Sequence, residues 1–140
     1  MKNTLTLGTF AIALLSFAAI THAQTPGCAA VEVQNLRPSQ GPLMLAAYTD
    51  AASFRKTAAS QMQVAVTGET MQLQVCGLTG GAVALTLYQD LNNNGKLDAN
   101  PFGIPTEPWA ASGKPAPMGP NWESAQVPFG AEAIVVKLSK

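Results

Sequence analysis

Apolar and polar residues alternate along most of the chain that follows residue 28. The clearest run is residues 71–75, where Met71, Leu73 and Val75 alternate with two glutamines. Because successive side chains of a β-strand point to opposite faces, this period of two predicts a strand that is buried on one side. The same pattern predicts further strands at residues 29–34, 43–48, 61–67, 82–89 and 134–138.

Turn-forming residues separate these strands, and no long helical period interrupts them. Residues 67–70 (Thr-Gly-Glu-Thr) predict a hairpin turn between two strands. Only residues 51–60 could form a helical turn or two. About seven short strands separated by Gly, Pro and Asn are typical of a β-sandwich. The sequence therefore predicts an all-β fold in a single domain, residues 24–140.

A segment rich in proline and glycine, residues 99–130, breaks the alternation. It holds seven of the ten prolines and both tryptophans. An unstructured connection of this length is uncommon inside a compact domain, and such connections are commonly functional. The aromatic residues of the segment offer apolar surface that can fold onto the sandwich. They are Phe102, Trp109, Trp122 and Phe129.

The first 23 residues have the pattern of a secretory signal peptide. A short basic start precedes an uncharged apolar run at residues 4–20, and Thr21-His22-Ala23 places small residues where a signal peptidase reads them. We expect cleavage after Ala23 and export to the periplasm or the extracellular space. An uncleaved membrane anchor is the alternative. No second apolar run follows, so we expect no membrane insertion after cleavage.

Charge and histidine content exclude several classes of function. The 140-residue sequence is 47% hydrophobic and only 11% charged, with a formal net charge of +0. A protein that binds nucleic acid through charge needs a basic face, and this composition does not supply one. The single histidine, His22, falls in the signal peptide. Histidine-dependent catalysis and histidine-ligated zinc are therefore excluded from the mature chain.

The sequence contains two cysteines, Cys28 and Cys76. In an oxidising compartment such a pair is more commonly a disulfide than two free thiols. The cysteines are far apart in the sequence, which argues against a redox-active pair. We therefore predict a structural bridge from the first strand to the end of the fourth.

Oxygen-bearing side chains follow the strand at residues 82–89 with regular spacing. They occupy positions 1, 3, 5 and 9 of a loop whose sixth residue is glycine, which is the spacing of a calcium-binding loop. Calcium prefers six to eight oxygen ligands, and alternate residues of a tightly wound loop aim their side chains inward. The predicted ligands are Asp90, Asn92, Asn94, the backbone carbonyl of Lys96, and Asp98.

The loop departs from an EF-hand at its twelfth position, which is Pro101 instead of a bidentate glutamate. A strand enters the loop and no amphipathic helix leaves it. Glu107 is the best candidate to complete the calcium shell, because the bend at residues 101–105 can bring it back to the loop. The alternative is an Asn/Asp/Gly turn that satisfies its own backbone without a metal.

The segment around this loop resembles a family of small secreted bacterial proteins that carries a domain of unknown function. The resemblance lies in residues 80–90 (GGAVALTLYQD), 92–98 (NNNGKLD) and 102–107 (FGIPTE). Gly41, Phe54 and residues 122–125 also fit, so that it covers nearly all of residues 28–138. It implies an immunoglobulin-like or prealbumin-like β-sandwich and a location in the bacterial envelope. It implies no known activity.

Three functions fit these observations. The first is a non-catalytic module of the envelope, stabilised by calcium, that binds a ligand or partner the sequence does not identify. The second is a glycosidase-like hydrolase that uses Asp90, Asp98 and Glu107 as acid and base. The third is a carbohydrate- or peptide-binding module built on Tyr88, Trp109 and Trp122, although aromatic side chains in so small a domain more commonly fill the core. We favour the first.

Overall fold

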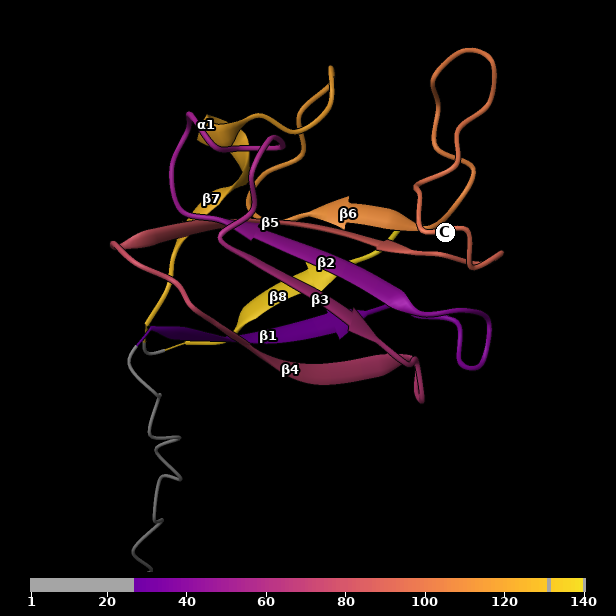
Figure 1. Ribbon diagram of the computed structural model, residues 1–140, viewed down its shortest axis with the longest axis horizontal. Coiled ribbons are helices and arrows are strands. Elements are labelled where there is room, and N and C mark those ends of the chain that lie inside the picture. Colours follow the sequence, from indigo (N-terminus) through magenta and orange to yellow (C-terminus); the bar gives the residue numbers. More distant parts are fainter. Residues whose placement is uncertain (1–26, 131, 140) are drawn as a thin grey trace, which may run out of the picture.

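The computed structural model describes residues 27–130 and 132–139 (Figure 1). The signal peptide predicted for residues 1–23 lies outside this part of the chain. The described residues form eight strands and one short helix. In chain order these are β1 (Cys28–Gln34), β2 (Leu43–Tyr48), β3 (Ser60–Val64), β4 (Thr70–Cys76), β5 (Ala82–Gln89), β6 (Trp109–Ala111), α1 (Trp122–Ala125), β7 (Gln126–Pro128) and β8 (Ile134–Lys137).

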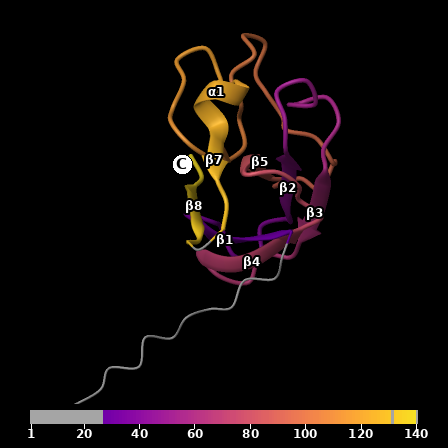
Figure 2. The same ribbon diagram turned by 90° about the vertical axis from the view of Figure 1, so that its left-hand side faces the viewer.

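The strands form two sheets, which confirms the predicted all-β sandwich. In the three-stranded sheet, β1 lies between β4 and β8 and pairs antiparallel with β4 and parallel with β8. The five-stranded sheet has the order β3-β2-β5-β6, and β7 pairs with the first half of β5. Figures 1 and 2 both show the loops after β2, β5 and β6 rising together on the outer side of this second sheet.

The hydrophobic core lies between the sheets and follows from the alternation in the sequence. Val31 and Val33 of β1 and Leu85 of β5 are completely buried, and their strand neighbours Glu32 and Thr86 are not. Each buried aliphatic side chain of this size stabilises the fold by about 1.5–3 kcal/mol relative to an exposed one. The period of two therefore fixes which face of each strand enters the core.

The predicted hairpin at residues 67–70 is wrong. The strands on either side of it, β3 and β4, belong to different sheets: β3 pairs with β2, and β4 pairs with β1. The strand predicted for residues 61–67 ends at Val64, and Val66 is buried in the core outside any strand. The turn residues therefore carry the chain from one sheet to the other. Turn composition alone does not distinguish this crossing from a hairpin.

Residues 51–56 form successive turns, in line with the turn or two expected within 51–60. Arg55 has a φ of 59° that a longer helix does not accept, and Ser60 already begins β3. Their start is fixed by Asp50, whose carboxylate accepts bonds from the backbone N–H and the hydroxyl of Ser53.

The proline-rich segment at residues 99–130 is ordered into β6, α1 and β7. Asn121 caps α1 by accepting a bond from the backbone N–H of Ser124. The expectation that the aromatic residues fold onto the sandwich holds for Phe129, which packs against the core, and for Trp122, which packs against Phe54. It is wrong for Phe102, which is 87% exposed at the tip of a projecting loop.

Cys28 and Cys76 form the predicted disulfide, and they lie directly opposite each other in the pairing of β1 with β4. A disulfide of this kind fits a protein that folds outside the reducing cytoplasm. Among the residues that the structure describes, no helix is long and apolar enough to cross a membrane.

Candidate functional site

The loop predicted to bind calcium begins where β5 ends, at Asp90. The backbone N–H of Asp90 donates to the carbonyl of Pro42 over 2.9 Å, and Gly41 packs against the Asp90 carbonyl. Asp90 is only 1% exposed. The start of the loop is therefore fixed to the turn that precedes β2, and the Asp90 carboxylate is held at the end of β5.

The carboxylate of Asp90 winds the loop around itself. One oxygen accepts the backbone N–H of Asn94 over 3.0 Å, and the other accepts the backbone N–H of Gly95 over 2.6 Å. The side-chain oxygen of Asn92 accepts the N–H of Asn94, and that of Asn94 accepts the N–H of Lys96. Asn93 and Gly95 have φ values of 57° and 76°, a left-handed conformation that asparagine and glycine adopt most readily.

The wound loop brings the side chains of Asn92, Asn94 and Asp98 together. The amide of Asn94 donates to both carboxylate oxygens of Asp98 over 3.0 Å, and the amide of Asn92 donates to one of them. These three side chains therefore satisfy one another, with the amide nitrogens turned toward the carboxylate. Rotation of each amide about its last bond would turn its oxygen inward in place of its nitrogen.

Glu107 joins the two ends of the loop. One carboxylate oxygen accepts the backbone N–H of Leu91 over 2.8 Å, and the other accepts the backbone N–H of Asp98 over 3.0 Å. The side chain is only 6% exposed. Its two bonds hold the first and last turns of the loop together, so Glu107 acts as a clamp on the loop backbone.

The segment at residues 99–105 returns the chain to the loop. Ala99 and Pro105 form an isolated antiparallel bridge, and the backbone N–H of Thr106 donates to the carbonyl of Asp98 over 2.8 Å. At its tip, the side-chain oxygen of Asn100 accepts the N–H groups of Phe102 and Ile104. This narrow fold-back places Glu107 beside the loop.

The carboxylates of Asp90, Asp98 and Glu107 do not gather around one point. Within residues 27–130 and 132–139, no three His, Cys, Asp or Glu side chains form a group that could hold a metal ion. Asp90 and Glu107 direct their oxygens to backbone N–H groups, and only Asp98 faces the two asparagine amides. The oxygen-bearing side chains are thus assembled around the loop in an arrangement closed by its own hydrogen bonds.

The three aromatic residues that the sequence suggested as a ligand surface divide into two groups. Tyr88 and Trp109 lie directly opposite each other on β5 and β6. Both are half-buried, and they lie on the outer face of the five-stranded sheet instead of between the sheets. Trp122 packs edge-on against Phe54, with ring centroids 6.3 Å apart, and Phe54 packs in the same way on Tyr48 at 5.2 Å.

Tyr88 is also coupled to the loop through charge. Partial burial raises the pKa of its hydroxyl above 10.0, and the negative charges of Asp90 and Glu107 raise this pKa further. The outer face of the sheet and the carboxylates of the loop are therefore close enough to interact electrostatically.

Gln89 holds the neighbouring turn in place, and the sequence analysis did not identify it. It is completely buried, accepts the backbone N–H of Arg37 over 2.8 Å and donates to the Arg37 carbonyl over 2.6 Å. A signal for it exists, because Gln89 continues the core-facing series of Val83, Leu85 and Leu87. A polar residue at such a position requires hydrogen-bond partners.

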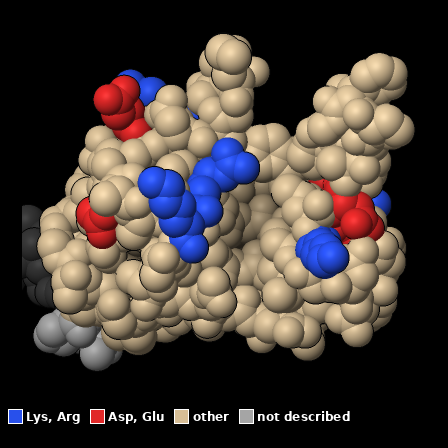
Figure 3. Space-filling model, turned by 45° about the horizontal axis from the view of Figure 1, so that its top comes forward, with Lys and Arg blue, Asp and Glu red and all other residues tan. Residues whose placement is uncertain are grey.

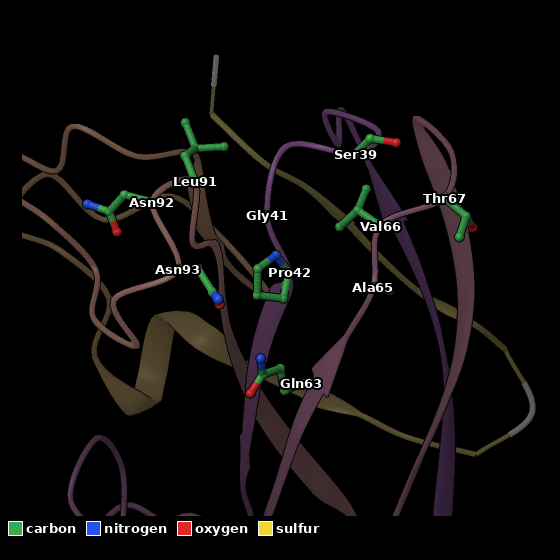
Figure 4. Close-up of a pocket in the computed structure, with 10 residues that line it drawn as sticks. All are labelled: Ser39, Gly41, Pro42, Gln63, Ala65, Val66, Thr67, Leu91, Asn92 and Asn93. Carbon is green, nitrogen blue, oxygen red and sulfur yellow. The ribbon is translucent and has the colours of Figure 1, made fainter.

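A hollow of about 850 Å³ lies between the start of the loop and two other segments. Figure 4 shows Leu91, Asn92 and Asn93 on one side of it, and residues 39–42 and 63–67 on the other. Its lining carries no charged side chain. The hollow gives solvent and ions access to one side of the loop.

Residues 31–137 match the family model described as "Uncharacterized protein conserved in bacteria (DUF2141)". The match covers most of the chain and confirms the resemblance noted in the sequence. Comparison with curated proteins and with solved structures gave no match.

Proposed function

The chain belongs to the DUF2141 family of uncharacterised bacterial proteins, and we propose that it is an exported, non-catalytic binding module whose sandwich is stabilised by one calcium ion. The observation that carries this proposal is the clamp of Glu107 on both ends of the 90–98 loop. A buried carboxylate that joins Leu91 to Asp98 keeps the loop wound without a metal. This clamp therefore supports a calcium site whose loop is partly preformed.

The ligands of the calcium ion would be the oxygens that the loop already gathers. Asn92, Asn94 and Asp98 are in mutual contact. Rotation of the two amides would turn their oxygens toward a cation and would break the bonds that these oxygens accept from the N–H groups of Asn94 and Lys96. Calcium accepts such neutral and charged oxygens in a flexible geometry. The proposed shell consists of Asp90, Asn92, Asn94, the Lys96 carbonyl, Asp98 and Glu107, with water in any remaining position. To join it, Asp90 and Glu107 would each turn an oxygen from a backbone N–H bond toward the ion.

The non-catalytic assignment is supported by the state of the carboxylates. A hydrolase of the glycosidase type needs two carboxyl groups that face the substrate from opposite sides. Asp90 and Glu107 are buried, and each already accepts two backbone N–H bonds. Both carboxylates therefore already hold the loop backbone, which favours a structural role over proton transfer.

Export is supported by the signal-peptide pattern of residues 1–23 and by the Cys28–Cys76 disulfide. We propose that the mature chain, residues 24–140, resides in the periplasm or outside the cell and is not inserted in the membrane. Its partner would be an envelope component rather than nucleic acid, because the composition lacks a basic excess. Mass spectrometry of protein recovered from the periplasm tests cleavage: the expected N-terminus is Gln24.

A calcium titration of the mature protein tests the metal site. A ligand that binds only the folded state raises the melting temperature by mass action. With few carboxylates in the shell, we expect a dissociation constant on the order of 10⁻⁴–10⁻³ M. The melting temperature should therefore rise between chelator and roughly 10 mM calcium. An unchanged melting curve over this range would contradict the metal proposal.

Asp98→Asn is the sharpest variant for this test. It removes one charge from the proposed shell, and the bonds that Asp98 accepts from the side chains of Asn92 and Asn94 are not part of the backbone clamp. We expect the calcium-dependent rise in melting temperature to be lost. Glu123→Gln, an exposed acid on α1, is the matched control and should keep the full calcium response.

A further inference from the structure

The outer face of the five-stranded sheet carries a row of large side chains across the strands. In the strand register, Gln63 of β3 lies beside Met44 of β2, Met44 beside Tyr88 of β5, and Tyr88 beside Trp109 of β6. All of these residues except the exposed Gln63 are half-buried. The row therefore forms a continuous bank, apolar and aromatic at its centre, with an amide at one end.

The next row on the same face is built from small residues. Gln61, Ala46, Thr86 and Ala111 lie side by side in the same register. Beyond them, Tyr48 lies beside Ala84, and the rings of Phe54 and Trp122 pack over this position. A second aromatic bank thus faces the first across a floor of alanine and threonine.

The parts of these rows on β3, β2 and β5 line a groove of about 440 Å³ that runs across the strands, and Trp109 on β6 continues the first row beyond it. Met44 and Tyr88 line one side of it, Tyr48 lines the other, and Gly95 of the 90–98 loop also contributes to the lining. Because residues two apart on a strand are about 6.7 Å apart, the two banks are separated by about 13 Å. A single sugar ring or a flat chain of rings fits a channel of this width.

Basic side chains lie on the two segments that adjoin the groove. Arg55 and Lys56 are exposed on the loop that carries Phe54, and Lys96 is exposed next to Gly95. Figure 3 looks onto this side of the molecule: Lys and Arg side chains gather directly to the left of a central hollow, with acidic groups farther to the left, and acidic and basic groups stand together on its right. Asp50, the acid on the Phe54 loop, is already bonded to Ser53. These bonds leave Asp50 charged, so residues 49–59 carry two basic side chains against one acid, a net charge of +1.

We propose that this groove binds a linear acidic oligosaccharide. Aromatic faces stack on the apolar faces of sugar rings, and the Gln61 and Gln63 amides can both donate to and accept from hydroxyl groups. Arg55 and Lys56 would pair with the carboxylates of the glycan. This inference rests on the binding role proposed above and names its ligand class, but it does not require calcium.

The direction of the groove favours a glycan over a peptide. An extended peptide that adds to a sheet pairs with a free strand edge and lies parallel to the strands. The groove instead crosses β2 and β5, which are paired on both sides, and reaches the edge strand β3 through the side chains of Gln61 and Gln63. Stacking and side-chain hydrogen bonds are the interactions that this surface offers.

The test is calorimetric titration of the mature protein with three probes: a hexamer of galacturonic acid, a neutral hexamer of glucose, and a hexaglutamate peptide. We expect the acidic hexasaccharide to bind, the neutral one to bind more weakly, and the peptide not to bind. Tyr88→Ala and Trp109→Ala should each weaken binding by about tenfold or more. Arg55→Gln with Lys56→Gln, on an exposed loop, should weaken binding of the acidic sugar and leave the neutral sugar unaffected.

Controls separate loss of the groove from loss of the fold. Gln74→Ala changes an exposed residue on the other sheet and should bind as the wild type does, and each variant's melting temperature reports folding. Titrations in calcium and in chelator separate this inference from the metal site, because sugar binding is expected in both. The proposal is overturned if the acidic sugar does not bind, if the aromatic variants bind it as tightly as wild type, or if the neutral sugar or the peptide binds equally well.

Discussion

Gly41 lies so close to Asp90 that no side chain fits between them. A Cβ atom on Gly41 would stand 1.9 Å from the carbonyl oxygen of Asp90, and Gly41 has a φ of +91°. The neighbouring backbone bond, from the Asp90 N–H to the Pro42 carbonyl, needs this close approach. The turn before β2 and the first residue of the candidate metal loop are therefore a single packed unit.

Gly41→Ala should lower the free energy of unfolding by roughly 2–4 kcal/mol, since it adds a backbone clash to a conformation that alanine rarely adopts. Urea denaturation measures this change. Gly80→Ala is the matched control, because Gly80 has a similar φ of +87° but nothing within 4 Å of the added Cβ. It should cost only about 1 kcal/mol. Equal losses for the two variants would show that the contact with Asp90 does not constrain the fold.

Opening the Cys28–Cys76 bridge should destabilise the protein without changing its sheet pairing. The bridge closes a loop with a sequence separation of 48 residues. In the chain-entropy model this stabilises the folded state by about 4 kcal/mol. We expect Cys28→Ser with Cys76→Ser to lose approximately this amount in urea denaturation. Labelling of denatured, unreduced wild type should detect no free thiol, and two reactive thiols per chain would contradict the bridge.

The strands were predictable because each strand of the sandwich buries one face. Val31 and Val33, for example, alternate with polar neighbours and enter the core as the pattern requires. Which strands pair with each other was harder to predict from the sequence. Residues 67–70 have the composition of a hairpin turn, but the strands beside them separate into different sheets. Pairing depends on contacts between residues distant in sequence, which local composition does not encode.

The candidate site was predictable in part for a similar reason. The predicted calcium ligands lie within one loop, so their spacing can be recognised in the sequence. They are Asp90, Asn92, Asn94 and Asp98. The exposure of Tyr88 and Trp109 on one sheet face depends on the register of β5 with β6. The alternation placed Tyr88 on the face opposite Leu87, but it predicted no strand at Trp109. The sequence also lacked the information that the described residues form two sheets, so that this face packs against the Phe54 loop and α1 instead of a third sheet.

The Phe54 loop should loosen in acid. Asp50 accepts bonds from the backbone N–H and the hydroxyl of Ser53, and these bonds hold the pKa of its carboxyl below 3.8. A carboxyl whose pKa is lowered by folding stabilises the folded state above its unfolded pKa, and this stabilisation is lost as the pH falls through the lowered value.

NMR titration of the Asp50 carboxyl should therefore give a midpoint below 3.8, its ordinary value. Ser53→Ala removes the hydroxyl bond but keeps the backbone bond, so the midpoint should move only part of the way back. Ser53→Thr retains a hydroxyl and is the control. A midpoint at or above the ordinary value in the wild type would contradict the bonds on which the prediction depends.

Glu107→Gln should destabilise the protein even in chelator, where no metal contributes. Glutamine has one side-chain oxygen, so it can accept the N–H of Leu91 or of Asp98 but not both. The remaining buried N–H then faces an amide N–H₂ group, and an unsatisfied donor of this kind costs about 1–3 kcal/mol. Urea denaturation in chelator should show this loss, whereas Glu123→Gln, on the exposed face of α1, should remain within about 0.5 kcal/mol of wild type.

If Glu107 also binds calcium, the difference between the two variants should widen when calcium is added, because only Glu107→Gln loses a ligand. Equal stability of the two variants in chelator would show that the loop does not depend on the clamp, and an unchanged difference in calcium would remove Glu107 from the metal shell.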